Sequence, residues 1–246
     1  MERKSFLRTF AVAAAAGPLL IEACKKDSTS AQTDSTTTTT TSTNGTTCTT
    51  TPTETEGPYP YVGGEITNPL NRADVTGGQT GVPLTVNFLV VNVNNNCNVV
   101  TGARVDIWHC NKDGYYSGYA NQPGLLGSKS YVGETWLRGY LLTDSSGLAK
   151  FTTIYPGWYG GRATHIHMEV FVNSVLKKVS QLTFSETISD AVHVSTLYAA
   201  HGINPIRNAN DSVFGDSATD LALETLALTG SVSAGYSGTF TLGVAL

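Results

Sequence analysis

Apolar and polar residues alternate in short runs along most of the chain after residue 80. Successive side chains of a strand point to opposite faces, so these runs predict half-buried strands. Within one run, Val105 and Ile107 fall on the same face. Asp144-Ser145-Ser146-Gly147 is a hairpin-loop signal between two other runs. The expected strands cover residues 83–91, 99–108, 137–143, 148–154, 164–172, 178–184, 226–232 and 238–244.

Helical patterns are scarce. Only residues 188–200 and 218–225 have a composition compatible with helices, and both segments are short. Many short strands separated by turn residues are typical of a sandwich or barrel rather than an α/β fold. We therefore expect an all-β domain, a β-sandwich of two packed sheets with long loops and little helix.

The first residues predict export. A charged start is followed by an apolar, alanine-rich run to Ile21, which is typical of a signal segment covering residues 1–23. Arg3-Lys4-Ser5-Phe6-Leu7 resembles a twin-arginine signal with Lys at the second arginine position, which leaves the export route open. Leu20 to Cys24 resembles a lipobox, which predicts a lipid on Cys24. The alternative is an ordinary cleaved signal with an incidental cysteine.

Residues 24–52 are dominated by Ser and Thr and have almost nothing apolar to bury. Such a segment cannot offset its ordering entropy, so we expect a flexible tether ahead of a domain at residues 53–246. Signal, anchor and tether together predict an exported, membrane-anchored lipoprotein on the periplasmic or cell-surface side. Which membrane and which face stay open.

Three cysteines follow Cys24, and an exported protein can join two of them. We favour Cys97 with Cys110, because the two flank one expected strand and turn; Cys48 with either of them is the alternative. No C-x-x-C spacing occurs among them, which argues against a structural zinc site. The net charge of −4 and the lack of a Lys/Arg cluster in the body of the chain argue against a nucleic-acid partner.

His165-Ile166-His167 is the sharpest local signal for chemistry. On a strand both imidazoles point to one face and can reach one metal, although an ordinary pair of core or surface histidines gives the same pattern. A zinc enzyme would need a third nitrogen or oxygen ligand, and a ferrous facial triad would need a carboxylate. A cupin also uses an H-x-H pair, but its glutamate and third histidine should follow, and here Glu169 is too close and His193 has no supporting pattern.

Tyrosines surround the histidine pair in the sequence instead. Phenolate is a hard anionic donor and an iron ligand in haem catalases. Two phenolates and a hydroxide would offset the charge of a ferric ion. The residue types therefore favour ferric iron over zinc or ferrous iron.

Four segments then appear in a specific order: Thr55-Glu56-Gly57-Pro58-Tyr59, the Asp106 to Ser117 segment with its Asp-Ile-Trp-His start, the Leu137 to Gly147 hairpin, and the Tyr155 to His167 segment. Together they resemble the intradiol ring-cleavage dioxygenases, of the catechol and protocatechuate 3,4-dioxygenase type. The resemblance covers about residues 53–246. It implies a β-sandwich holding Fe(III) through two tyrosines and two histidines, and insertion of both atoms of O2 into a catechol-type diol to give a cis,cis-muconate-type diacid.

The resemblance also implies residue roles. Tyr116 would stay bound to iron, whereas Tyr159 would be released when the substrate binds. His165 and His167 match the histidine ligands. Arg162 would stabilise negative charge that develops on the substrate. Gln181 falls where the family has a polar residue behind the ligands, in less distinctive surroundings.

Other aromatic residues and histidines near these motifs could either take part in the site or only support the fold. Tyr115 would face away from Tyr116 on an extended segment, and Tyr155 is expected to pack rather than bind. Tyr59 and Trp158 either line the substrate pocket or pack in the core. His109 is expected to be structural. We expect His193 and His201 on the surface, because no partner pattern surrounds them.

The chain departs from the family in two places. The stretch from Tyr159 to His165 is short, and the helical dimerisation region of catechol 1,2-dioxygenases is replaced by signal and tether. The identity of the catechol and the oligomeric state therefore stay open, with a homo-oligomer as one option. The rival functions are a non-catalytic surface lipoprotein that binds aromatic or carbohydrate ligands, and a zinc hydrolase, which the missing third histidine weakens.

Overall fold

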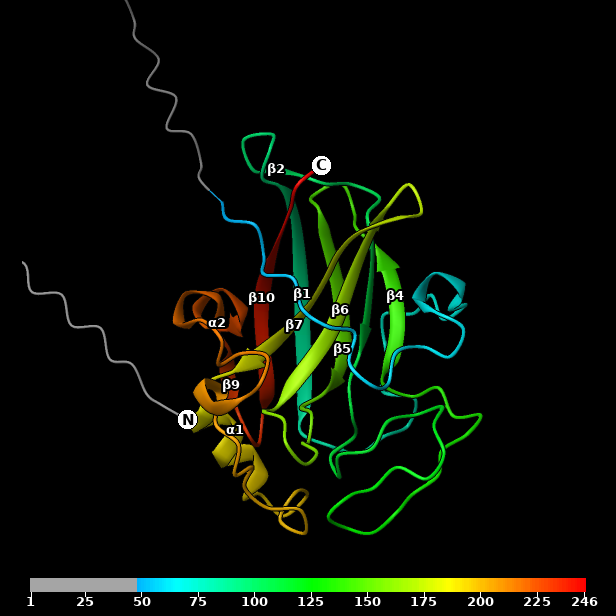
Figure 1. Ribbon diagram of the computed structural model, residues 1–246, viewed down its shortest axis with the longest axis vertical. Helices are drawn as coiled ribbons and strands as arrows, with labels where there is room; N and C mark the ends of the chain where they lie inside the picture. Colours follow the sequence, from blue (N-terminus) through cyan, green and yellow to red (C-terminus); the bar gives the residue numbers. More distant parts are fainter. Residues whose placement is uncertain (1–47) are drawn as a thin grey trace, which may run out of the picture. The chain divides into compact units, whose positions relative to one another are not determined.

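Two mixed β-sheets face each other in the computed structural model, which describes residues 48–246 (Figure 1). The expected all-β sandwich with little helix is confirmed. The first sheet contains β1 (Pro83–Asn92), β2 (Asn98–Val99), β5 (Leu148–Ile154), β9 (Thr229–Ser231) and β10 (Gly235–Val244). The second sheet contains β3 (Arg104–Trp108), β4 (Arg138–Leu142), β6 (His165–Val172), β7 (Val175–Phe184) and β8 (Thr225–Leu226).

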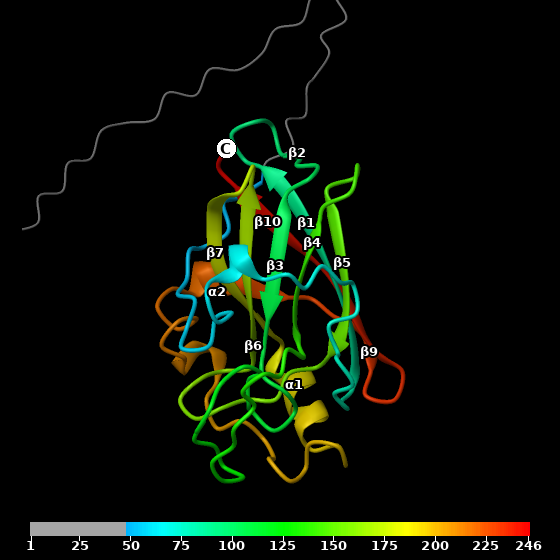
Figure 2. The same ribbon diagram turned by 90° about the vertical axis from the view of Figure 1, so that its right-hand side faces the viewer.

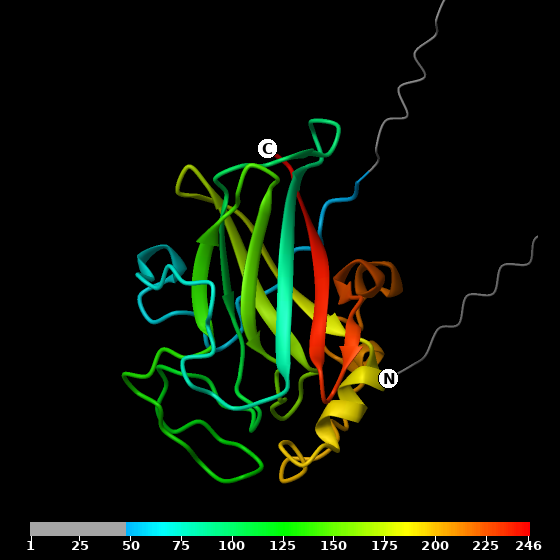
Figure 3. The same ribbon diagram turned by 180° about the vertical axis from the view of Figure 1, so that it is seen from behind.

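Strand order brings distant parts of the chain together. β1 pairs in parallel with β10 and antiparallel with β5, and Figure 3 shows β10 directly beside β1 from behind. In the second sheet β3 lies between β4 and β6, and β6 pairs with β7. Asn173 and Ser174, with φ of 51° and 62°, make the tight turn between β6 and β7. Positive φ at both central residues suits the right-handed twist of a two-residue hairpin.

The core fills the space between the two sheets. Val86, Phe88 and Val90 alternate inward along β1, and Val105 and Ile107 do so on β3. Phe88 makes edge-on contacts with two further rings, at centroid distances of 5.9 Å and 6.2 Å. Each fully buried side chain of this size stabilises the fold by roughly 1.5–3 kcal/mol. This core holds β6 rigidly in the centre of its sheet.

Two expected strands are divided in the structure. The segment at residues 99–108 is interrupted at Gly102, whose φ of 72° makes a turn between β2 and β3. The segment at residues 226–232 divides into β8, which pairs with β7, and β9, which pairs with β10 in the other sheet. Apolar content alone gave no sign of these changes of direction.

The two expected helices exist, and the first is shorter than expected. α1 spans Glu186–His193 and α2 spans Ala218–Glu224. After α1 the chain continues in turns, and the N–H of Ser195 bonds three residues back to Val192. Two short 3₁₀ segments, η1 (Glu65–Thr67) and η2 (Asn208–Asn210), complete the elements. No helix within residues 48–246 is long and apolar enough to cross a membrane.

Residues 48–57, which we call the N-terminal strap, lie along the outside of the sheets (Figure 1). The N–H of Thr51 donates to Gly243 O and the N–H of Glu54 to Val179 O, each at 3.0 Å. Lys178 Nζ donates to Thr51 O and to the hydroxyl of Thr53, each at 2.7 Å. The strap therefore connects both sheets, and ordered contacts begin before the domain start expected at residue 53.

The disulfide joins Cys48 to Cys97, and Cys110 is free and buried. The favoured pairing of Cys97 with Cys110 is wrong, and the alternative with Cys48 is correct. β3 runs away from the turn that holds Cys97 and ends just before Cys110 (Figure 2). The two cysteines therefore lie at opposite ends of the strand. The expected export signal, the lipid site at Cys24 and the tether up to residue 47 lie outside the described residues.

Candidate metal centre

His165 and His167 lie on β6 with both rings completely or almost completely buried. Their Nε2 atoms face each other at 3.1 Å, as expected for residues two apart on one strand face. The Nδ1 atom of His165 lies 2.6 Å from the carbonyl oxygen of Ala163. That contact requires Nδ1–H to donate, which leaves the Nε2 lone pair of His165 facing inward.

Tyr116 and Tyr159 bring their hydroxyl groups to the same point. Tyr116 OH lies 3.3 Å and Tyr159 OH 3.4 Å from His165 Nε2. Ligand atoms that bind one metal at about 2 Å lie about 3 Å from one another, so four suitable donor atoms converge here. Among residues 48–246 no group of three or more His, Cys, Asp or Glu side chains could hold a metal. A metal at the two histidines would therefore take its further protein ligands from the two phenols.

The rear of the site is built by neighbouring strands and the strap. Trp108 lies directly opposite His167 in the pairing of β3 with β6, and the two rings stack at 5.0 Å with only 5° between their planes. Gly57 of the strap lies against the Cε1 edge of the same ring, because an added Cβ would lie 2.7 Å from Cε1 of His167. His167 Nδ1 is buried without a hydrogen-bond partner among the described residues. Packing rather than hydrogen bonding orients this ring.

Electrostatics keep both histidines neutral. Burial, followed by the charge of Arg162, lowers the pKa of His165 to about 3. Burial also lowers the pKa of His167 well below its usual value, with His165 adding to the effect. A neutral imidazole is the form that binds a metal, so neither histidine carries a positive charge that would oppose metal binding near neutral pH.

The phenols have the opposite requirement. Burial raises the pKa of Tyr116 well above its usual value and that of Tyr159 to about 12. Without a cation both would stay protonated near neutral pH. A ferric ion supplies the charge that favours phenolate, and two phenolates with two neutral imidazoles suit such a hard, highly charged ion. The residues present therefore fit non-haem Fe(III).

Arg162 lies beside the donors in a hydrogen-bonded chain. Its Nε donates to Asp211 at 2.9 Å, and its Nη2 donates to Gln181 Oε1 at 2.7 Å. Gln181 in turn donates to Thr55 O of the strap at 2.8 Å. Burial opposes the charge of the guanidinium, but Asp211 together with Tyr159 and Tyr116 outweighs it, so the pKa of Arg162 is raised and its charge is kept.

A cavity of about 520 Å3 opens beside Tyr159. Tyr59 and Trp158, for which the sequence left both pocket and packing roles open, both lie on its wall. Tyr59 also stacks on Tyr116 with ring centroids 4.7 Å apart, so it both packs against a candidate ligand and lines the cavity. The remaining lining residues are Pro123, Gly124, Leu125, Gly160 and His201.

Comparison with known proteins decides the family. Residues 55–202, well over half of the chain, match the family model described as Dioxygenase. The chain belongs to the intradiol ring-cleavage dioxygenases. Members of this family typically use non-haem Fe(III) and act on aromatic diols with O2.

Individual relatives of the intradiol family are distant. Catechol 1,2-dioxygenase 1 of Acinetobacter lwoffii is 26% identical over 144 residues, which is 51% of this chain and 43% of that enzyme. The intradiol ring-cleavage dioxygenase of Tetranychus urticae has a TM-score of 0.70 at 27% identity, over 80% of this chain and 95% of that one. The dioxygenase domain of a carbohydrate-binding fusion protein from Streptomyces sp. SirexAA-E shares the fold, with a TM-score of 0.56 at 24% identity, over 80% of this chain and 99% of that one.

The structure corrects the expectation that His193 and His201 lie on the surface. His193 is buried with Nε2 at 3.3 Å from Pro156 O, and His201 packs on Trp158 with ring centroids 4.1 Å apart. α1 and the turns after it fold over the end of the sandwich, which a local pattern does not reveal. His109 is structural as expected, with its two nitrogens on Cys110 O and Thr153 Oγ1. Tyr115 faces away from the site and donates to Gly127 O.

The intradiol family resemblance missed one charged partner. Asp211 accepts hydrogen bonds from both Arg162 and the N–H of Ala163, next to the histidine strand. It lies far along the chain in an Asn-Ala-Asn-Asp stretch that looks like an ordinary polar loop. No spacing signal connects it to Arg162. Pro123 to Leu125 were missed for the same reason.

Proposed function

We propose that this protein is a non-haem Fe(III) intradiol dioxygenase that inserts both atoms of O2 into a catechol-type aromatic diol, giving a cis,cis-muconate-type diacid. The observation that carries the proposal is the convergence of Tyr116, Tyr159, His165 and His167 beside a cavity large enough for one aromatic ring. When bound, ferric iron supplies Lewis acidity and a template for both reactants. The mononuclear catechol is the substrate class that the cavity and the relatives support.

The two tyrosines differ in a way that supports separate roles. Tyr116 is completely buried under the stacked ring of Tyr59, so it has no room to move. Tyr159 is partly exposed and lines the cavity, where an incoming diol would meet it. Because the pKa of Tyr159 is raised to about 12, its released side chain is well suited to keep a proton taken from the diol. Tyr116 is the permanent ligand and Tyr159 the one that leaves.

Arg162 is the group that would face charge developing on the bound diol. Its hydrogen bonds to Asp211 and Gln181 hold the guanidinium in one orientation. A preorganised charge in a water-poor site stabilises an anion without reorganisation at the moment of reaction. Gln181 acts through Arg162 and positions it rather than touching the substrate.

Absorption spectroscopy with oxygen uptake tests the proposal. The purified, iron-loaded protein should be burgundy from phenolate-to-iron charge transfer and should consume O2 with a panel of catechols. Tyr116→Phe and His165→Ala should lose both colour and activity. Tyr119→Phe is the matched control, because Tyr119 OH donates to Pro60 O and not to the centre. A colourless protein that binds metal fully would favour a zinc site, and a coloured protein inert to every catechol would favour a binding protein.

We also propose export and anchoring through Cys24. The disulfide between Cys48 and Cys97 supports an oxidising compartment. Mass spectrometry of the membrane fraction should find a lipid on Cys24, and Cys24→Ala should release the protein from that fraction. Unlipidated wild-type protein in the soluble fraction would contradict anchoring without bearing on the chemistry.

A further inference from the structure

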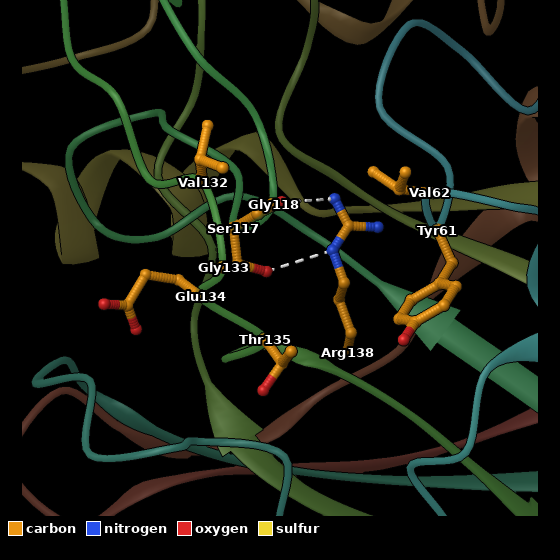
Figure 4. Close-up of a pocket in the computed structure, with 9 residues that line it drawn as sticks. All are labelled: Tyr61, Val62, Ser117, Gly118, Val132, Gly133, Glu134, Thr135 and Arg138. Atoms are coloured by element: carbon orange, nitrogen blue, oxygen red, sulfur yellow. Dashed lines mark hydrogen bonds between the residues drawn. The ribbon is translucent and has the colours of Figure 1, made fainter.

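A second cavity lies at the loops beside β4 and shares no lining residue with the cavity at Tyr159 (Figure 4). Its volume is about 340 Å3. The wall comes from the segments around Tyr61, Gly118 and Glu134 and from the first residue of β4, Arg138. That volume is in the range of pockets that hold small organic molecules.

Arg138 in this wall has one guanidinium nitrogen, Nη1, whose two N–H groups have no hydrogen-bond acceptor among the described residues. Its side chain is buried, with 2% of the residue exposed. Nε donates to Ser117 Oγ at 3.0 Å and Nη2 to Ser117 O at 2.9 Å. Nη1 has no hydrogen-bond partner among the described residues, and Figure 4 shows it pointing away from Ser117 toward the side with Tyr61 and Val62.

The charge of Arg138 is also unpaired. No ion pair of residues 48–246 includes it, and burial lowers its pKa even though the Glu65 charge opposes that change. Glu65 itself accepts the N–H of Tyr61. Glu134 on the rim is exposed, and its carboxylate points away from Arg138 in Figure 4. A buried guanidinium with no carboxylate in direct contact is costly, which favours an anion nearby.

The rest of the wall limits which anion fits. Val62 and Val132 are 63% and 68% exposed and lie on either side of Arg138 in Figure 4, with the Tyr61 ring beside Val62. These surfaces suit an apolar body rather than a hydrated inorganic ion. A planar carboxylate matches the geometry of guanidinium donors.

We propose that this cavity binds a small organic carboxylate, whose oxygens accept from Arg138 Nη1 and whose apolar body lies between Tyr61, Val62 and Val132. The site adjoins the candidate metal centre. Arg138 Cζ lies 5.8 Å from the centroid of the Tyr116 ring, and Arg138 Nε donates to the hydroxyl of Ser117, the residue after Tyr116. The inference does not depend on the proposed catalytic function.

Calorimetric titration of the full chain with benzoate tests the site, with benzamide as the neutral molecule of the same shape. Benzoate should bind and benzamide should not. Val132→Trp, which fills the cavity from an exposed position, should weaken benzoate binding by at least about tenfold. Arg138→Met should do the same. Val175→Trp is the matched control, since Val175 is 54% exposed and is not among the lining residues of this cavity.

Three results would overturn the proposal. Absence of benzoate binding would mean that Arg138 Nη1 has no organic carboxylate as its acceptor. Equal binding of benzamide would remove the role of its charge. Benzoate binding that survives Val132→Trp but is lost in Leu125→Trp, at the other cavity, would place the ligand beside Tyr159 instead.

Discussion

Gly57 lies against the ring of His167 so closely that an added Cβ would be 2.7 Å from Cε1. Its φ of 69° is also in the left-handed region that favours glycine. The residue that belongs to the N-terminal strap therefore sets the position of a candidate ligand on a central strand. Space and backbone conformation both require glycine there.

Gly57→Ala should displace the His167 ring and lower iron content and oxygenase activity by at least about tenfold, since a shift of about 1 Å in a site can cost about a hundredfold. Iron per chain and the phenolate band measure this. Gly64→Ala is the control, because Gly64 has a φ of 89° but no atom within 4 Å of an added Cβ. Equal losses in the two variants would mean that backbone strain alone explains the effect.

Asp211→Asn should reduce kcat by about tenfold or more and leave KM less affected, because it frees Arg162 from its fixed orientation. It should also lower the free energy of unfolding by about 3–5 kcal/mol, as breaking a buried pair leaves a charge uncompensated. Steady-state kinetics and urea unfolding measure the two effects. Asp190→Asn removes the half-exposed pair with Arg207 and should change neither. Unchanged kinetics in Asp211→Asn would remove the positioning role.

Glu224→Gln should become more stable than the wild type as pH rises. Burial, followed by the neighbouring Glu54, raises the pKa of Glu224 to about 8 in the folded protein. A raised carboxyl pKa contributes stability that is complete below the unfolded value and is lost as pH rises through the folded one. Between about pH 5 and pH 8 the difference should grow by more than about 1 kcal/mol. Urea unfolding at both pH values measures it, and exposed Glu134→Gln should show no such trend.

Removal of the disulfide by Cys48→Ser with Cys97→Ser should lower the free energy of unfolding by about 2–4 kcal/mol. It should also reduce iron retention, because the freed strap carries Gly57. Cys110→Ala is the control, since this thiol is buried with its pKa raised to about 12 and lies outside the strap. In protein that is lipidated at Cys24, thiol titration of the native wild type should find no reactive cysteine, and one, Cys110, after denaturation. Normal iron retention in the double variant would show that the strap holds without its covalent link.

The sequence predicts the sandwich because apolar and polar residues alternate along strands such as β1. It also identifies the four expected metal donors, because family motifs surround each one. His165 and His167 need only strand periodicity to share a face. Tyr116 and Tyr159 needed the family resemblance, since no spacing rule places a loop tyrosine beside a distant strand. The metal set itself stays a prediction that colour and mutation will test.

What the sequence does not reveal depends on long-range packing. Asp211 reaches Arg162 from 49 positions away, and His201 meets Trp158 across 43 positions in a loop with no pattern of its own. Cys97 pairs with Cys48 because the strap passes the turn at one end of β1, whereas sequence proximity favoured Cys110. In each case the fold brings together residues that are locally unremarkable.

The parallel pairing of β1 with β10 determines when the domain can fold. Leu84 pairs with Tyr236 and Asn92 with Val244, so β10, which is synthesised long after β1, completes the sheet that β1 begins. Closing a loop of about 150 residues carries a large entropic cost, and such non-local pairing slows folding. A nascent chain that still lacks β10 leaves one edge of β1 open. The donors on β6 are therefore expected to assemble into one site only after β10 has been synthesised.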